Sequence, residues 1–423
     1  MKILWAVNVV PADVAERLGC KPGFFGGWVE SMARELKKVP DLELTVASKI
    51  GPDVRFDQTI EGIRYVSIGY DSKTKEEALK ERCLAIIDSV KPELVHVEGT
   101  EFLHAKAMLL AAKERKIPVI ASMQGILNGY YSYQCGELQV DDLMWSWSLT
   151  NIVSGWMLHL RKTRWYKPRM KPEREIIGMA DYILGRTTWD RAHSYALNPK
   201  AEYFSVNRNL RAPFYEKIWS PEGMERHSIY VGNGYRALKG LHFVVEALPL
   251  LAREYPDVKV YVAGDRPFQE NDKRSIFKKG YGAYLKKRIK DLDVAKYIEF
   301  TGPLQAPEVA EKLSKVNCYL LCSTIENSPN TLGEAMLIGT PCVAAYVGGV
   351  SDMATDGEEA LFYRSNDPVL LAWAVKRIFD DDSLALRLSE NGKKKAAQTH
   401  DTAINAGRLV DAYRTILAKK AGA

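Results

Sequence analysis

Two glutamates, Glu326 and Glu334, lie eight positions apart on either side of a polar turn that contains Pro329. A carboxylate accepts two hydrogen bonds and therefore suits a pair of neighbouring sugar hydroxyls. Between the glutamates the chain enters a predicted helix, whose first N–H groups and positive dipole end favour an anion. The stretch can therefore hold a phosphate with sugar hydroxyls on either side, which is the chemistry of a sugar nucleotide.

A buried strand and a helix are predicted to position this turn. The run Val316–Cys322 is almost wholly apolar, which predicts a strand buried on both faces of a parallel sheet. Residues Thr331–Ile338 read as a helix that ends at Gly339. Glu334 then lies about one turn into the helix, and Glu326 lies in the loop before it.

This stretch resembles the Glu-x7-Glu signature of the GT4 family of retaining glycosyltransferases. Glu326 and Glu334 supply the two glutamates, Ser328–Thr331 matches the proline loop, and Gly339-Thr340-Pro341 matches the end of the helix. The resemblance implies an α/β chain with the GT-B fold, in which two Rossmann-like, doubly wound domains face each other across a cleft. It also implies retaining transfer of a sugar from a UDP- or GDP-sugar to a glycan or a lipid-linked acceptor.

The resemblance implies roles for individual residues. Glu334 would hold the ribose hydroxyls, and Glu326 would face the transferred sugar. Lys239 matches a lysine of the family that stabilises the leaving diphosphate. The family's arginine, six residues earlier, is Asn233 here, so Arg236 is expected to supply that cation. Further donor contacts are expected at the diphosphate and the base, from Gly26, Gly27, Pro329, Asn330, Thr331, Leu332, Thr301 and Leu304.

Strands that alternate with helices in the first half predict a parallel, doubly wound sheet, which binds ligands beyond the carboxyl ends of its strands. Gln124 follows such a strand, at the place of a family histidine, and would present a carbonyl and a hydrogen-bonding side chain to the reacting sugar. His96 and Glu98 end another strand, and would line an acceptor pocket or contact a neighbouring loop. The strands are predicted at Lys2–Val9, Leu42–Ala47, Ile63–Ser67, Leu94–Glu98 and Pro118–Ser122, and a later helix is predicted at Pro172–Ala180.

Residues 126–172 fit the alternation poorly and are rich in aromatic side chains. From Arg161 to Glu175 there are seven basic residues and two glutamates, a net charge of +5. Aromatic rings beside a basic run are favoured at a membrane interface. Two interpretations stay open: a surface for a membrane or a lipid-linked acceptor, and a helical insertion packed on the first domain.

The length of 423 residues predicts two or three domains. We expect residues 1–210 to be an acceptor-binding domain that includes the insertion, and residues 211–400 to bind the nucleotide sugar. Residues 401–423 are expected to form a helix that packs back on the first domain.

Composition points to a soluble protein, with 46% hydrophobic and 26% charged residues and no apolar run near the ~20 residues that span a bilayer. The six scattered cysteines, without a Cys-x-x-Cys pair, fit reduced thiols in the cytoplasm, with attachment to the inner face of the membrane as an option. The net charge of +6 allows an anionic substrate or a lipid surface and does not argue for nucleic acid.

No His/Cys cluster has metal-ligand spacing, and no Asp-x-Asp follows a predicted strand. We therefore expect no cofactor and no metal, with Lys239 and Arg236 in the metal's place. The resemblance to the GT4 family implies an acceptor in bacterial surface polysaccharide biosynthesis. Two alternatives to a glycosyltransferase stay open. One is a non-catalytic sugar-nucleotide-binding subunit of a glycan assembly complex, and the other is a GT-B sugar-nucleotide epimerase. The sequence leaves the sugar, the linkage and the oligomeric state open.

Overall fold

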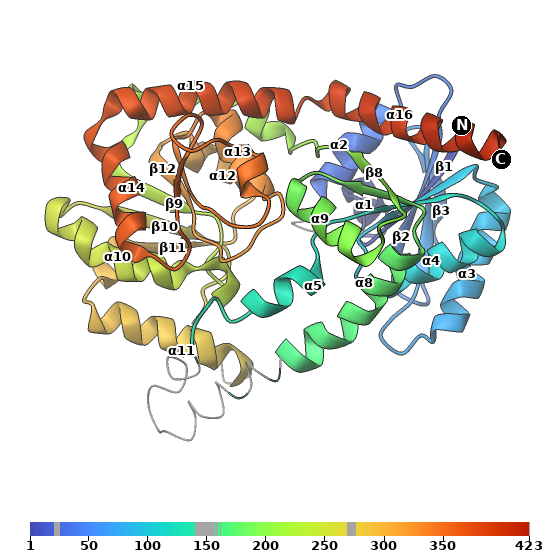
Figure 1. The fold of residues 1–423 in the computed structure, drawn as a ribbon, viewed down its shortest axis with the longest axis horizontal. Coiled ribbons are helices and arrows are strands. Elements are labelled where there is room, and N and C mark those ends of the chain that lie inside the picture. Colours follow the sequence, from blue (N-terminus) through green and yellow to red (C-terminus); the bar gives the residue numbers. More distant parts are fainter. Residues whose placement is uncertain (21–25, 140–155, 157–159, 161, 269–275, 423) are drawn as a thin grey trace. The chain divides into compact units, whose positions relative to one another are not determined.

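The computed structural model describes residues 1–20, 26–139, 156, 160, 162–268 and 276–422 (Figure 1). The chain divides into two compact units. Unit 1 comprises Met1–Gly129, Pro168–Arg211 and His400–Ala423, and unit 2 comprises Tyr130–Lys167 and Ala212–Thr399. Each unit is built around a sheet of its own.

The sheet of unit 1 has eight strands in the order β3-β4-β2-β1-β5-β6-β7-β8. All neighbours pair in parallel except β3, which runs antiparallel to β4. Strand order runs outward in both directions from β1, as in a doubly wound sheet. The strands are β1 Lys2–Val7, β2 Glu43–Ile50, β3 Asp57–Ile60, β4 Ile63–Gly69, β5 Leu94–Glu98, β6 Val119–Ser122, β7 Tyr182–Gly185 and β8 Glu202–Ser205.

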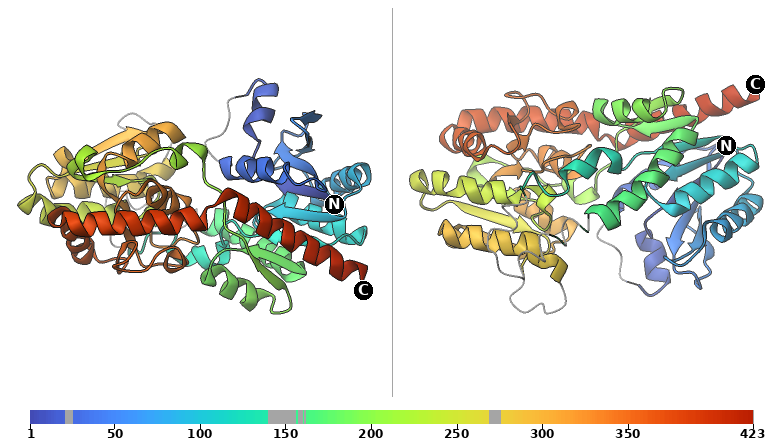
Figure 2. Two further views of the ribbon diagram at one scale, coloured as in Figure 1. Left: turned by 90° about the horizontal axis from the view of Figure 1, so that it is seen from above. Right: turned by 60° about the horizontal axis from the view of Figure 1, so that its bottom comes forward.

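Helices cover both faces of this sheet. One core joins the strands to α3, α4 and α8, and the other joins them to α1, α2 and α16. The C-terminal helix α16 therefore packs beside α2 on unit 1, as expected for residues 401–423 (Figures 1 and 2). The helices are α1 Ala12–Arg17, α2 Gly27–Leu36, α3 Glu76–Val90, α4 Leu103–Glu114, α5 Leu127–Tyr130, α8 Lys167–Met179, α9 Thr188–Leu197 and α16 Thr402–Ala421.

The sheet of unit 2 has six parallel strands in the order β11-β10-β9-β12-β13-β14. The strands are β9 Glu225–Val231, β10 Lys259–Ala263, β11 Ile298–Gly302, β12 Val316–Leu321, β13 Cys342–Ala345 and β14 Leu361–Tyr363. The helices are α10 Leu241–Glu254, α11 Ile276–Asp291, α12 Ala306–Leu313, α13 Asn330–Ile338, α14 Pro368–Asp380 and α15 Asp382–Thr399. Every residue of β12 is buried, as the apolar run predicts.

The assignment of residues 126–172 to the first domain was wrong for the part from Tyr130 to Lys167, which belongs to unit 2. Close packing explains this. The ring of His242 hydrogen-bonds through Nε2 to the Gly136 carbonyl at 3.0 Å, and a Cβ at Gly136 would lie 2.3 Å from the Ala237 oxygen. Residues 140–155, with two of the tryptophans that prompted the membrane interpretation, lie outside the described residues.

The boundary expected near residue 210 lies one residue from the end of the unit 1 segment at Arg211. The sequence predicts a helix start at Pro172. In the structure helix α8 begins five residues earlier, at Lys167, and continues through that proline. None of the described helices is long and apolar enough to cross a lipid bilayer. No disulfide joins the six cysteines, all of which lie in the described part of the chain.

Candidate functional site

An ion pair between Lys239 and Glu326 is the centre of the candidate site in unit 2. The Lys239 Nζ lies 2.5 Å from the Glu326 Oε1, and the same oxygen accepts a hydrogen bond from the Ser323 hydroxyl at 2.7 Å. Glu326 is only 8% exposed. Charge-assisted bonds are the stronger kind, so both side chains are held in one arrangement.

A glycine allows Lys239 to reach this position. Gly240 has a φ of +71°, and a Cβ there would lie 1.7 Å from the Cys322 oxygen, which leaves room for glycine alone. The Thr324 N–H donates to the Leu238 carbonyl at 2.9 Å. The turn Ala237–Lys239 is thereby attached to the end of β12, directly before the loop that carries Glu326.

The helix that follows the loop, α13, presents its N-terminus at the same edge of the sheet. Pro329 is its N-cap and, as a proline, has no side-chain group that could cap the first turn. The Tyr319 hydroxyl donates to Thr331 Oγ1 at 2.8 Å and orients this turn against β12. The first N–H groups of α13 and the helix dipole provide a place for an anion.

Two carboxylates flank this helix start, as the sequence predicts. Glu326 lies in the loop before α13, and Glu334 lies within the helix and is 2% exposed. Leu332, between them, is fully buried and packs the helix on the sheet. The structure thus brings together Glu326, Lys239 and the residues Pro329–Leu332. Their roles toward a ligand stay predictions.

Arg236 contacts a segment that the sequence did not connect with it. Its Nη2 donates to Gln134 Oε1 at 3.0 Å, and its guanidinium lies 5.7 Å from the centre of the Tyr166 ring. Gln134 and Tyr166 belong to the Tyr130–Lys167 part of unit 2. Asn233, where the family has arginine, accepts a hydrogen bond from the N–H of Tyr235 at 3.0 Å. The sequence has no signal that pairs Arg236 with Gln134, because such a contact depends on long-range packing.

The expected base-contact residues lie at the carboxyl edge of the same sheet. Thr301 is in β11, and its hydroxyl donates to the Gly302 carbonyl at 3.1 Å. Leu304 follows in the loop and is half-buried. Since all six strands are parallel, the loops after β9, β11 and β12 share one edge.

The remaining predicted residues belong to unit 1. The amide groups of Gln124 and Asn8 pair reciprocally at 3.0 and 3.2 Å, and Arg186 Nη2 donates to the Gln124 carbonyl at 3.2 Å. Gly26, with a φ of +109°, precedes α2, which begins at Gly27. The loop 21–25 before them lies outside the described residues. The predicted set is therefore divided between the two units.

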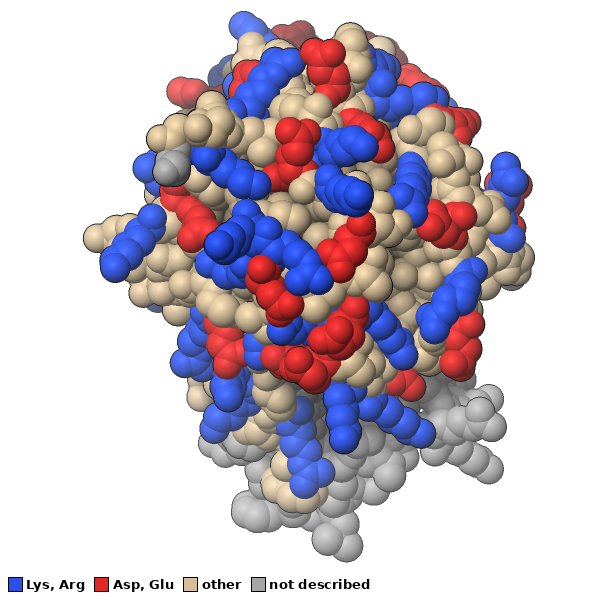
Figure 3. Space-filling view, turned by 90° about the vertical axis from the view of Figure 1, so that its right-hand side faces the viewer, with Lys and Arg blue, Asp and Glu red and all other residues tan. Residues whose placement is uncertain are grey.

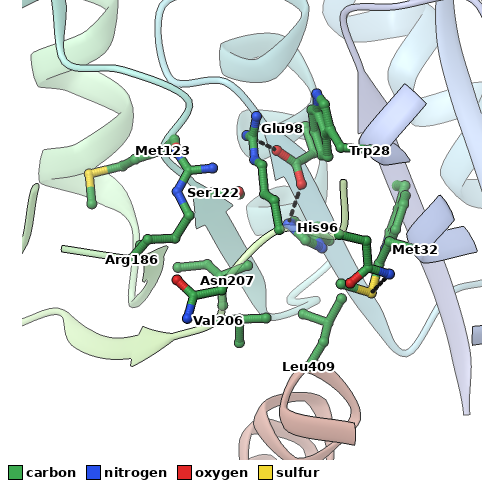
Figure 4. A pocket seen from close by; sticks show the side chains of 15 residues that line it. Trp28, Met32, His96, Glu98, Ser122, Met123, Arg186, Val206, Asn207 and Leu409 are labelled. Atoms are coloured by element: carbon green, nitrogen blue, oxygen red, sulfur yellow. Dashed lines mark hydrogen bonds and ion pairs between the residues drawn. The ribbon is translucent and has the colours of Figure 1, made fainter. Parts of the chain in front are cut away.

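His96 and Glu98 lie in a buried polar cluster of unit 1 (Figure 4). His96 Nε2 is 3.3 Å from a Glu98 oxygen, Arg208 Nη2 is 3.6 Å from the other, and His96 Nδ1 is 2.6 Å from the Tyr413 hydroxyl. The cavity beside them has a volume of about 30 Å³, room for about one water molecule. Both side chains therefore lie in the interior of unit 1, and their role toward an acceptor stays a prediction.

Burial and charge act in opposite directions on this cluster. Burial raises the pKa of Glu98, but the hydrogen bond from His96 and the positive charge of Arg208 outweigh it and hold that pKa below its usual value. Burial lowers the pKa of Arg208 to about 9. Its guanidinium also stacks 3.6 Å from the centre of the Trp28 ring. The paired charges stabilise each other in an interior that would penalise either one alone.

In the described part of the chain, no group of three or more His, Cys, Asp or Glu residues is arranged so that it could hold a metal ion.

Two Rossmann-like units, each with a parallel sheet between helices, define the GT-B fold, and this prediction is confirmed. The structure of Anabaena Alr3699/HepE in complex with UDP-glucose aligns with a TM-score of 0.68 over 98% of this chain and all of that chain, at 14% identity. At such identity the likeness concerns the fold alone.

Residues 213–395, less than half of the chain, match the model of the family described as glycosyl transferases group 1. The D-inositol 3-phosphate glycosyltransferase of Corynebacterium urealyticum is 24% identical over 189 residues, 44% of this chain and 42% of that protein. The lipopolysaccharide core biosynthesis glycosyltransferase LpsE of Rhizobium meliloti is 28% identical over 185 residues, 43% of this chain and 47% of that protein. The matches thus span less than half the length of these relatives.

Proposed function

We propose that this protein is a retaining glycosyltransferase that moves a sugar from a nucleoside-diphosphate sugar to a glycan or a lipid-linked acceptor. The observation that carries the proposal is the Lys239–Glu326 pair beside the N-terminus of α13. It lies at the carboxyl edge of a parallel sheet, in the part of the chain that matches the model of the glycosyl transferases group 1 family.

The donor would bind in unit 2 with its diphosphate at the start of α13. Glu334 would accept from the ribose hydroxyls, and Glu326 would face the transferred sugar. As the bond between the anomeric carbon and the diphosphate breaks, negative charge grows on the leaving oxygen. Lys239, assisted by Arg236, would stabilise that charge more in the transition state than in the ground state.

In this mechanism the acceptor hydroxyl attacks the anomeric carbon on the face that the diphosphate leaves. A new carbon–oxygen bond replaces the old one, and the hydroxyl proton passes to an oxygen of the departing phosphate. No protein group acts as the base, which agrees with glutamine at position 124. Lys239 and Arg236 would perform the charge stabilisation that a divalent metal performs elsewhere, so the proposal includes metal independence.

The setting we propose is bacterial surface polysaccharide synthesis at the cytoplasmic face of the membrane. The name of the Rhizobium meliloti relative, a lipopolysaccharide core glycosyltransferase, supports this setting. The complex of a protein of the same fold with UDP-glucose supports a nucleotide-sugar donor. A non-catalytic sugar-nucleotide-binding subunit is the alternative, favoured by the unusual Gln124 and Asn233. Slow donor hydrolysis without acceptor distinguishes the two, because a pure binder shows none.

A thermal-shift panel of nucleoside diphosphates and their sugars, each with and without EDTA, tests the donor site. A ligand at a hundred times its Kd stabilises the native state by about 2.7 kcal/mol, a visible shift. We expect one nucleotide, UDP or GDP, to raise the melting temperature equally with and without EDTA. The Lys239→Ala variant should lose most of the shift. A matched variant, Lys217→Ala, removes an exposed ion pair with Glu311 in the same unit and should keep it.

No shift with any nucleotide would contradict the donor assignment. A shift that disappears in EDTA would contradict metal independence and leave the donor site standing.

We also propose that α8 contributes to a lipid-facing surface. Lys167, Lys171 and Arg174 are exposed and recur every three to four residues, so they lie on one face of the helix. By contrast, Lys and Arg are interspersed with Asp and Glu on the face drawn in Figure 3. Cosedimentation should be seen with vesicles of phosphatidylglycerol and not of phosphatidylcholine. The double variant Lys171→Glu with Arg174→Glu should reduce binding by at least about 30-fold, since each of the two basic residues contributes about 1 kcal/mol near an anionic surface. Equal binding by the double variant would refute this surface.

A further inference from the structure

Unit 2 contains a cavity of about 730 Å³ that none of the predicted residues lines. Its walls are the loops after β13 and β14, the residues just before Glu326, and the segment Tyr133–Gln139. Its volume lies within the range of about 300–1,000 Å³ that is usual for small-molecule sites. The cavity is therefore large enough for a ligand of its own.

The segment that closes one side of the cavity is fitted closely to unit 2. Gly136 has a φ of +65° and no room for a Cβ against Ala237, and the next residue, Glu137, has a φ of +61°. Asn366, which also lines the cavity, has a φ of +61° as well. A left-handed glutamate is costly, and such strain gathers where it orients a functional side chain. The geometry thus holds the Glu137 carboxylate against the cavity.

The charges of the lining decide what kind of ligand fits. The lining includes two carboxylates, Glu137 and Asp367, and one guanidinium, Arg364, so its formal net charge is −1. The Asp367 carboxylate also caps α14, because it accepts from the Leu370 N–H at 2.9 Å. Burial raises the pKa of Glu137, and the charge of Arg364 opposes that rise. An excess of carboxylate disfavours a phosphate or another anion. It suits a neutral ligand rich in hydroxyls, because carboxylates accept and guanidinium donates hydrogen bonds.

The aromatic ring of Tyr346 completes the lining. Tyr346 is 62% exposed, although its backbone N–H is bound to the Tyr363 carbonyl at 2.8 Å, so the ring projects from an anchored strand end. A flat apolar face next to directed polar groups matches a sugar ring, which has one apolar face and an edge of hydroxyls.

We propose that this cavity is a carbohydrate subsite, which takes a neutral sugar unit of the acceptor glycan and is separate from the nucleotide site. Ile325 lines the cavity, and Glu326 follows it directly. The Glu326 carbonyl accepts from the Gly349 N–H at 3.0 Å, so the loops of the cavity wall also support the predicted sugar-facing glutamate. The place of this subsite in a transfer reaction rests on the proposed function, whereas sugar binding at the cavity does not.

Saturation-transfer NMR on the full chain tests the subsite directly. The probes are methyl α-D-glucopyranoside, maltose, cellobiose and lactose, with inorganic phosphate as a competitor. We expect at least one saccharide to bind and phosphate not to displace it. Tyr346→Ala should weaken that binding at least ten-fold, and Arg364→Gln, an exposed and conservative change, should also weaken it. Trp373→Ala, which removes an exposed aromatic ring on α14 away from the cavity, should leave it unchanged.

The nucleotide thermal shift, measured on the same variants, separates this proposal from the proposed function. An unchanged shift in Tyr346→Ala with lost saccharide binding supports the subsite. Nucleotide binding without any saccharide signal overturns the subsite alone, and saccharide binding without nucleotide binding overturns the donor site alone. Saccharide binding that survives both Tyr346→Ala and Arg364→Gln, or that phosphate displaces, also overturns the subsite.

Discussion

Replacing Lys239 by alanine is expected to lower the turnover of donor sugar by about 10²–10³-fold, the usual effect of deleting one group that stabilises developing charge. The ammonium group contacts Glu326 at 2.5 Å, and its side chain is 28% exposed, so its loss should not open the core. The effect is measured as the rate of donor hydrolysis in the absence of acceptor, with the released nucleoside diphosphate as the readout. We expect a loss in kcat in addition to the loss of nucleotide binding, because the charge on the diphosphate grows further in the transition state.

Two matched variants make this prediction specific. Lys239→Arg keeps a cation and should retain part of the activity, whereas Lys217→Ala, in the same unit, should retain all of it. Lys239 also holds Glu326 in place, so Glu326→Gln and the double variant are needed to separate the two roles. If the residues act as a unit, their effects will not add. Full turnover by Lys239→Ala would show that the phosphate role is wrong.

Replacing Tyr413 by alanine is expected to reduce the free energy of unfolding of unit 1 by about 3–5 kcal/mol, the usual cost of deleting a buried aromatic ring. Tyr413 is fully buried in α16. Its hydroxyl accepts from Trp5 Nε1 at 2.8 Å and lies 2.6 Å from His96 Nδ1. Without the Tyr413 hydroxyl, the ring nitrogens of Trp5 and His96 would each lose a buried hydrogen-bond partner, which adds to the loss of stability. Urea unfolding, followed by tryptophan fluorescence, measures the change.

Tyr413→Phe separates the ring from the hydroxyl. It keeps the packing and should cost about 1–3 kcal/mol, since the hydroxyl's buried partners lose a hydrogen bond. Arg414→Ala, an exposed change on the same helix, should cost less than about 0.5 kcal/mol. A loss below 1 kcal/mol for Tyr413→Ala would mean that α16 contributes little to the stability of unit 1.

Local patterns predicted the elements of unit 2 that surround the candidate site. The apolar run from Val316 predicted β12, and the glycine at position 339 marked the end of α13 at Ile338. These signals are local, because a buried parallel strand must be apolar and a helix end needs a residue that adopts positive φ. The spacing of Glu326 and Glu334 around them likewise needs no long-range information.

Helix α8 shows where a local signal misled. Pro172 was interpreted as a helix start, since proline favours the first turn. The structure instead begins the helix at Lys167 and carries it past the proline. Ile176 and Ile177, fully buried on α8, pack in the core of unit 1 and can offset the lost hydrogen bond. Tertiary packing outweighs propensity at such a site.

The sequence by itself determined the alternation of strands and helices, and with it the doubly wound sheets and the loop that carries Glu326. Only the tertiary structure decided that His96 and Glu98 are interior residues, because their partners Arg208 and Tyr413 come from distant parts of the chain. It alone also decided that Gln134 contacts Arg236 and that Glu137 lines a cavity in unit 2. Periodicity describes how one element faces its neighbours, whereas such contacts depend on which distant segments the whole fold brings together.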